Sequence, residues 1–143
     1  MGADGFGQLD FLSKLVEPNY TVITNIGESH IEFFKSREGI AKAKFEITNG
    51  MKKDGYFVYN GDEVLLKTLV DSSKINATSC GENSYNDIIL ENYTITRDKI
   101  DFKLNISDEQ YFTKLKGKQS NLIIFFLKAS CLRASKTHNA TLT

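Results

Sequence analysis

The sequence predicts an α/β fold, in which helices pack on a mainly parallel β-sheet that carries a small antiparallel β appendage. Between residues 7 and 81, short apolar runs of strand length alternate with segments of helical periodicity. The first of these runs is almost continuously apolar, which is typical of parallel strands buried on both faces. From residue 88 onward apolar and polar residues alternate instead, as in antiparallel strands. Together these patterns predict a partial three-layer, Rossmann-like sheet that is incomplete for a doubly wound domain.

The first expected helix covers residues 7–16, GQLDFLSKLV. Its apolar residues recur at helical spacing, namely Leu9, Leu12, Leu15 and Val16. The sequence Glu17-Pro18-Asn19 ends this helix, because proline cannot continue it. A first strand is expected over residues 20–26.

The second expected helix runs from about Arg37 to Asn49. Ser36 has the side chain of an N-cap, and Gly50 suits the C-cap. The third expected helix covers residues 62–73 and has acidic residues in its first turn. Strands are expected on either side of it in the sequence, at 55–61 and at 75–81.

The antiparallel appendage is expected over residues 88–117. Residues 88–106 predict a hairpin that turns at Arg97-Asp98-Lys99, and a further strand is expected near 111–117. The tail from Gln119 is expected to start as a helix and to end as a disordered segment. The domain division is therefore 1–117, followed by a divergent basic tail at 118–143.

The composition is that of one soluble globular domain, with 143 residues, 41% hydrophobic and 25% charged residues and a net charge of zero. Cys80 and Cys131 are too few for a disulfide framework or a zinc set and fit reduced thiols. The start lacks the features of a signal peptide, and the longest apolar run, at 122–127, is too short to span a bilayer. We therefore expect a cytoplasmic protein with neither membrane nor nucleic acid as a partner.

Lys44 is the first candidate for chemistry. On the second helix, Ile40, Ala43, Ile47 and Met51 form one apolar stripe, and Lys44 falls inside it. Such a lysine either extends its ammonium to water or sits at a site where burial lowers its pKa. A neutral amine of the second kind is nucleophilic and can be modified, for instance by carbon dioxide to a carbamate.

The stretch TNIGESH (24–30) follows the first strand and contains Asn25 and His30. Ligand sites in open α/β sheets gather at the carboxyl ends of strands, where a histidine can bind a metal or act as a base. From the residues alone, a capping or surface histidine is the simpler explanation of His30. The sequence NGDE (60–63), at the next strand end, fits either a site or a plain turn with a helix N-cap.

Three stretches together resemble the central domain of the Mur ligase family. They are MGADGFGQLDFL at the start, VITNIGESHIEFFKSREGIAKAKFEI at 22–47 and YFVYNGDE at 56–63. The resemblance covers about residues 1–117 and is strongest from Val22 to Ile47. It is closest to the branch that adds D-alanyl-D-alanine to UDP-N-acetylmuramoyl tripeptide.

The resemblance implies ATP-dependent amide bond formation through an acyl phosphate, with Mg²⁺ screening the phosphate charge. His30 matches the family's metal-binding histidine. Lys44 matches the lysine that the family carbamylates, where the new carboxylate helps to hold a second magnesium ion. Asn25 lies in the same motif and is carried over only as an active-site neighbour.

Several family features do not occur in these 143 residues. The GxxGKT/S phosphate-binding loop is absent, and the magnesium-binding glutamate would precede Met1. After Gly117 and Lys118 the family's register is lost, which a shifted reading frame or a degraded gene would explain. We therefore expect the 143 residues alone to be inactive, with doubtful binding of ATP and Mg²⁺. The alternative is a non-catalytic binding or self-assembling module that keeps the fold.

Overall fold

The computed structural model describes residues 2–27, 31–95, 99–106 and 109–116. Six strands form one sheet in the order β1-β2-β3-β4-β5-β6. Their bounds are β1 Tyr20–Ile23, β2 Tyr56–Asn60, β3 Ala77–Gly81, β4 Ile88–Ile95, β5 Lys99–Ile106 and β6 Glu109–Lys116. The pairs β1–β2, β2–β3 and β3–β4 are parallel, whereas β4–β5 and β5–β6 are antiparallel. The α/β fold with a mainly parallel sheet and an antiparallel appendage is confirmed.

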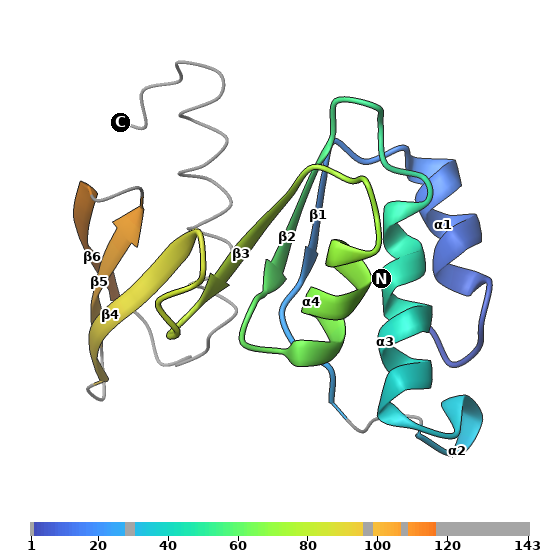
Figure 1. Ribbon diagram of the computed structural model, residues 1–143, viewed down its shortest axis with the longest axis horizontal. Coiled ribbons are helices and arrows are strands. Elements are labelled where there is room, and N and C mark those ends of the chain that lie inside the picture. The colour runs from blue at the N-terminus through green and yellow to red at the C-terminus, as the bar shows by residue number, and fades with distance from the viewer. Residues whose placement is uncertain (1, 28–30, 96–98, 107–108, 117–143) are drawn as a thin grey trace.

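One helix precedes β1, and the others lie between β1 and β3 in the sequence. They are α1 Gln8–Val16, α2 Ile31–Phe34, α3 Arg37–Phe45 and α4 Val64–Asp71, with a short 3-10 helix, η1, at Glu46–Thr48. Figure 1 shows α1, α3 and α4 gathered beside β1–β3, while β4–β6 extend the molecule in the other direction. No helix within the described ranges is long and apolar enough to cross a membrane.

Side chains of the sheet alternate between two hydrophobic clusters, as the period of a β-strand requires. Phe57 and Tyr59 of β2 point to the helix side, where they pack with Ile40 and Ala43 of α3 and with Leu66 of α4. On the other side the cluster comprises Val58, Cys80, Ile88, Leu90, Phe102, Leu104 and Ile106. The antiparallel strands therefore share a core with β2 and β3 instead of forming a separate unit.

The junction between the two parts of the sheet is narrow. Strands β3 and β4 pair only through Cys80 with Ile88 and Gly81 with Ile89. A parallel pair normally needs a long crossover, but here residues 82–87 connect the two strands directly. The short overlap of β3 and β4 makes such a short connection possible. Hydrogen bonds to Asp62 hold the connecting loop in place.

The helix predicted at 7–16 is confirmed, but its apolar residues are not all buried. Leu9 is 5% exposed, but Leu15 is 72% exposed and Val16 is 57% exposed. The contact is made instead by Ser13, whose hydroxyl donates to the carbonyls of Asp10 and Glu46 and accepts from the amide of Gly50 at 3.1 Å. The short side chain of Ser13 and the missing one of Gly50 let the two backbones approach closely.

Other boundaries differ from the expectation in detail. Strand β1 ends at Ile23, and the α-helix predicted to Asn49 ends at Phe45, where the 3-10 helix takes over. Helix α4 has no acidic residue in its first turn, because Glu63 is its N-cap. The four-residue helix α2 was not predicted. The predicted turn at 97–99 falls mostly, and the tail at 118–143 falls entirely, outside the described residues.

Candidate functional site

The candidate site lies where β1 ends and the chain continues toward α2. Helix α3 contacts this segment through two of its side chains. Ser36 caps the start of the helix by accepting from the amide of Gly39 at 3.1 Å. Ile40 and Ala43 then bury one face of the helix, with 1% and 2% exposure. This packing confirms the predicted apolar stripe and sets the direction of the next residue, Lys44.

Lys44 is half-buried at the edge of that stripe. Its Nζ donates a hydrogen bond to the main-chain oxygen of Asn25 at 2.9 Å. Burial lowers the pKa of Lys44, because the charged ammonium loses hydration. A main-chain oxygen carries no full charge and so compensates this loss only in part. The neutral, nucleophilic amine is therefore easier to reach here than on an exposed lysine.

Asn25 enters this arrangement through its backbone rather than its side chain, which is exposed. The structure thus brings the main chain of Asn25 and the side chain of Lys44 together. His30, the third candidate, lies outside the described residues. Its role as a metal ligand stays a prediction.

A second cation on α3, Arg37, reaches the next residue of the same segment. Its Nη2 donates to the main-chain oxygen of Ile26 at 3.3 Å and pairs with a carboxylate oxygen of Glu63 at 2.8 Å. Sequence reasoning missed this contact. A signal was available only for the pair with Glu63, namely an arginine directly after the N-cap Ser36 and an acidic residue at the start of α4.

The NGDE sequence forms a turn and a cap, the simpler of its two interpretations. The side-chain oxygen of Asn60 accepts from the amide of Asp62 at 3.0 Å, and Glu63 accepts from the amide of Leu65 at 3.5 Å. These contacts fix the exit of β2 and the entry to α4. Glu63 also faces the candidate site through its ion pair with Arg37.

Asp62 holds the loop between β3 and β4. Its carboxylate accepts from the amides of Glu82 at 2.6 Å and Asn83 at 3.2 Å, and from the side chains of Asn83 at 2.8 Å and Asn86 at 2.7 Å. Burial alone would raise the pKa of Asp62, but these hydrogen bonds outweigh it, and the pKa is lowered. Because its oxygens are occupied by donors, Asp62 serves as an anchor for the loop and not as a ligand for a cation.

The described residues contain no cluster of three or more His, Cys, Asp or Glu side chains that could hold a metal ion. Cys80 is a free, buried thiol, and burial raises its pKa, so it is a poor nucleophile. Among the described residues of this edge, the amine of Lys44 therefore remains the candidate reactive group.

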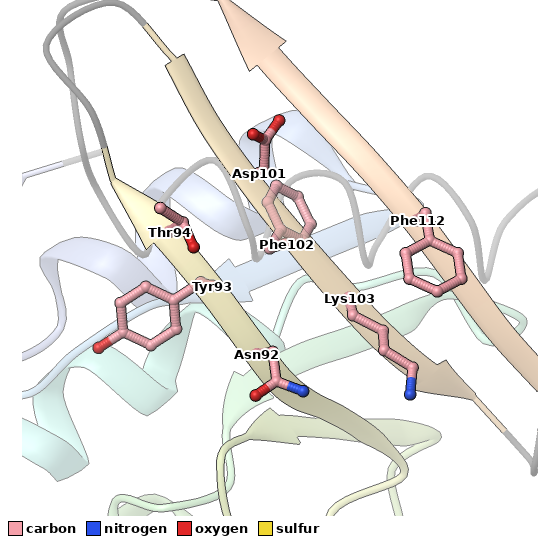
Figure 2. A pocket seen from close by; sticks show the side chains of 7 residues that line it. All are labelled: Asn92, Tyr93, Thr94, Asp101, Phe102, Lys103 and Phe112. Carbon is pink, nitrogen blue, oxygen red and sulfur yellow. The ribbon is translucent and has the colours of Figure 1, made fainter.

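A groove of about 380 Å³ lies elsewhere, on the antiparallel strands. Figure 2 shows its lining side chains on β4, β5 and β6, with Lys103 near the ring of Phe112. Lys103 is already paired with Glu91. The groove and the Lys44 site are lined by different residues, so the groove adds nothing to that site.

Comparison with known proteins shows the family to which the chain belongs. Residues 1–123 match the family model of the Mur ligase middle domain. The chain is 40% identical over 125 residues to the UDP-N-acetylmuramoyl-tripeptide–D-alanyl-D-alanine ligase of Bacillus subtilis, covering 84% of this chain and 26% of that protein. The ligase of the same name from Buchnera aphidicola is 32% identical over 119 residues, which cover 80% of this chain and 25% of that protein.

The fold comparison agrees with the sequence comparison. A crystal structure of a MurF ligase from Thermotoga maritima in complex with ADP matches with a TM-score of 0.79 and 25% identity, over 96% of this chain and 32% of that one. MurF from Acinetobacter baumannii matches with a TM-score of 0.78 at 22% identity, over 99% of this chain and 31% of that one, and shows the fold alone. The chain spans about a quarter of the length of the curated relatives. It belongs to the Mur ligase middle domain family.

Proposed function

We propose that this chain provides the central-domain part of a ligase that adds D-alanyl-D-alanine to UDP-N-acetylmuramoyl tripeptide, with ATP as the energy source. The two relatives named above carry this activity in their names, and the first is 40% identical over most of the chain. ADP in the Thermotoga maritima complex supports a nucleotide as co-substrate. Synthesis of a UDP-linked precursor would place the protein in the cytoplasm.

The observation that carries the proposal is the environment of Lys44. A half-buried amine with a lowered pKa and a neutral hydrogen-bond acceptor is suited to react with carbon dioxide. In that reaction the lone pair of Nζ forms a bond to the carbon of CO₂, one π pair moves to oxygen, and a proton passes to water. The product is a carbamate with one negative charge on a side chain that carried a cation.

The carbamate would change what the site can bind. Magnesium prefers oxygen ligands, which an ammonium cannot offer and a carbamate can. His30 and carbamylated Lys44 would hold the metal, with Asn25 as the neighbour that orients Nζ. When bound, Mg²⁺ supplies electrostatic stabilisation to the phosphates and to the acyl phosphate formed from the substrate carboxylate.

A chimeric enzyme tests the function directly. The matched 125 residues would replace their counterparts in the Bacillus subtilis relative, and ligation of D-alanyl-D-alanine would be assayed with tripeptide precursor and ATP. We expect turnover, and a loss of at least about 100-fold on Lys44→Met, since a charged group at the phosphates is worth several kcal/mol. Lys42→Met, an exposed lysine on the same helix, is the matched control. A folded but inactive chimera, or an active Lys44→Met variant, would contradict the proposal.

The 143 residues by themselves should not turn over, because they contain no GxxGKT/S loop to hold the ATP phosphates. The same ligase assay on the isolated chain measures this. Product formation by the isolated chain above a no-protein blank would show that the phosphates can be held without that loop.

The exposed side of α1 supports a self-assembling module as the second candidate. Phe11 is 66% exposed, Leu15 72% and Val16 57%, so the helix presents apolar side chains that nothing in the described ranges covers. Light scattering of the chain and of Phe11→Ser/Leu15→Ser tests this. Concentration-dependent growth that the double variant abolishes would support assembly, and a monomer at all concentrations would exclude it.

A further inference from the structure

Two consecutive main-chain oxygens after β1 are each held by a cation from the same helix. Asn25 accepts from Lys44 at 2.9 Å, and Ile26 accepts from Arg37 at 3.3 Å. Arg37 and Lys44 are seven residues apart, so they lie on the same face of α3, about 10 Å apart along its axis. The segment that leads from β1 is therefore fastened to α3 at two adjacent points.

Arg37 is itself fixed by a second element. Its Nη2 carries two hydrogens, one for Ile26 and one for the carboxylate of Glu63 at 2.8 Å. The Glu63 side chain is only 12% exposed and also caps α4 by accepting from Leu65. The carboxylate thus has little freedom, whereas the Arg37 side chain is 45% exposed, so water screens the pair from the guanidinium side.

The side chain of Ile26 completes the restraint. It is 2% exposed and belongs to the cluster between the sheet and the helices. Packing holds residue 26 from one side, and the guanidinium of Arg37 holds its carbonyl from the other. Since Asn25 is the preceding residue, its carbonyl oxygen is presented to Nζ of Lys44 in one orientation.

We propose that Arg37 and Glu63 are positioning residues for Lys44. They act by fixing the Asn25 carbonyl oxygen, and that oxygen orients Nζ of Lys44. This inference rests on the proposed carbamylation of Lys44. After carbamylation Nζ keeps a single hydrogen, and the Asn25 oxygen is its acceptor. The direction of that hydrogen bond determines where the two carbamate oxygens point. Loosening the segment that contains Asn25 and Ile26 would leave the carbamate without a fixed orientation. The carbamate would then release carbon dioxide more readily.

The test uses the whole chain with two readouts. Carbamate at Lys44 is measured by ¹³C NMR in ¹³C-bicarbonate, and hydrogen exchange of residues 24–27 is followed by mass spectrometry. Arg37→Met should lower carbamate occupancy about fivefold and speed exchange of residues 24–27 by a similar factor, which corresponds to about 1 kcal/mol. Exchange in β2 should stay unchanged, whereas a merely structural role would speed it as well.

Three further variants separate the causes. Arg37→Lys keeps the charge, but its shorter side chain places the ammonium short of the Nη2 position that contacts both Ile26 and Glu63, so it should resemble Arg37→Met. Glu63→Gln keeps an oxygen for the α4 cap but loses the ion pair, and it should show a smaller effect in the same direction. Lys42→Met removes an exposed cation from the same helix and should leave both readouts unchanged.

The outcomes distinguish this inference from the proposed function. No carbamate on the wild-type chain, together with faster exchange in Arg37→Met, would remove the role of Lys44 and keep the restraint by Arg37. Normal exchange of residues 24–27 in Arg37→Met would overturn the inference, whatever the carbamate signal. Wild-type occupancy in Arg37→Lys would overturn it too, since charge alone would then suffice.

Discussion

Asp62→Asn should weaken the junction between the parallel and antiparallel parts of the sheet. The carboxylate of Asp62 accepts four hydrogen bonds from Glu82, Asn83 and Asn86. In the amide variant the better orientation places the new NH₂ against the amide of Glu82, which loses that bond. The three other bonds then go to a neutral oxygen. A hydrogen bond to a charged group contributes about 1.5–3 kcal/mol, so we expect a loss of about 2 kcal/mol.

The lowered pKa of Asp62 also predicts how the stability deficit of Asp62→Asn changes with pH. The pKa of Asp62 in the folded chain lies below its ordinary value of 3.8, so the folded state favours the charged carboxylate. The stability that this preference contributes is complete above the unfolded pKa and is lost as pH falls through the folded pKa. The deficit of Asp62→Asn relative to wild type should therefore be full at neutral pH and shrink below about pH 4.

Urea denaturation at neutral pH and near pH 3 measures both quantities, and a thermal scan should show a loss of about 6 °C. The matched control is Asp71→Asn, which removes an exposed pair with Lys67 at 3.4 Å and should cost less than about 0.5 kcal/mol. Two results would refute the reasoning: an Asp62→Asn deficit no larger than that of Asp71→Asn, or a deficit that stays constant between the two pH values.

Three other outcomes are expected. Because burial lowers its pKa, Lys44 should be acetylated by acetic anhydride at a lower pH than free Nα-acetyl-lysine, as peptide mass spectrometry across a pH series would show. Gly50→Ala should cost more than about 2 kcal/mol in urea, because a Cβ would lie 2.1 Å from the carbonyl carbon of Ser13, whereas Gly2→Ala meets nothing within 4 Å and serves as its control. Leu66→Ala, at a site with 0% exposure, should lose about 3 kcal/mol by the same measurement.

The sequence predicted the elements whose signals are local. Ser36 caps α3 because its hydroxyl can accept an amide hydrogen three residues on, a preference that depends on no distant residue. The position of Lys44 followed from helical periodicity alone, since its neighbours Ile40 and Ala43 were recognisably apolar. The alternation in β4 and β5 predicted their hairpin for the same reason.

What the sequence could not predict depends on distant partners. Ser13 reads as a polar residue on an amphipathic helix, yet it is 0% exposed because Gly50, distant in the sequence, lies against it. Leu15 fits the apolar stripe of α1 but remains exposed, since periodicity says which residues share a face and not what covers that face. The contact of Arg37 with Ile26 was missed because a main-chain acceptor has no sequence signature.

A main-chain acceptor for Lys44 fits the reactive amine that we propose. A carboxylate at the position of the Asn25 oxygen would stabilise the ammonium, raise its pKa and reduce the neutral fraction that can attack carbon dioxide. Leaving the amine with no acceptor would keep it neutral but free to rotate. A carbonyl oxygen avoids both outcomes, because it orients Nζ without contributing a full negative charge. The carboxylate of Glu63, which also faces this corner, is instead occupied by Arg37 and the α4 cap, so its charge is neutralised before it can compete for Lys44.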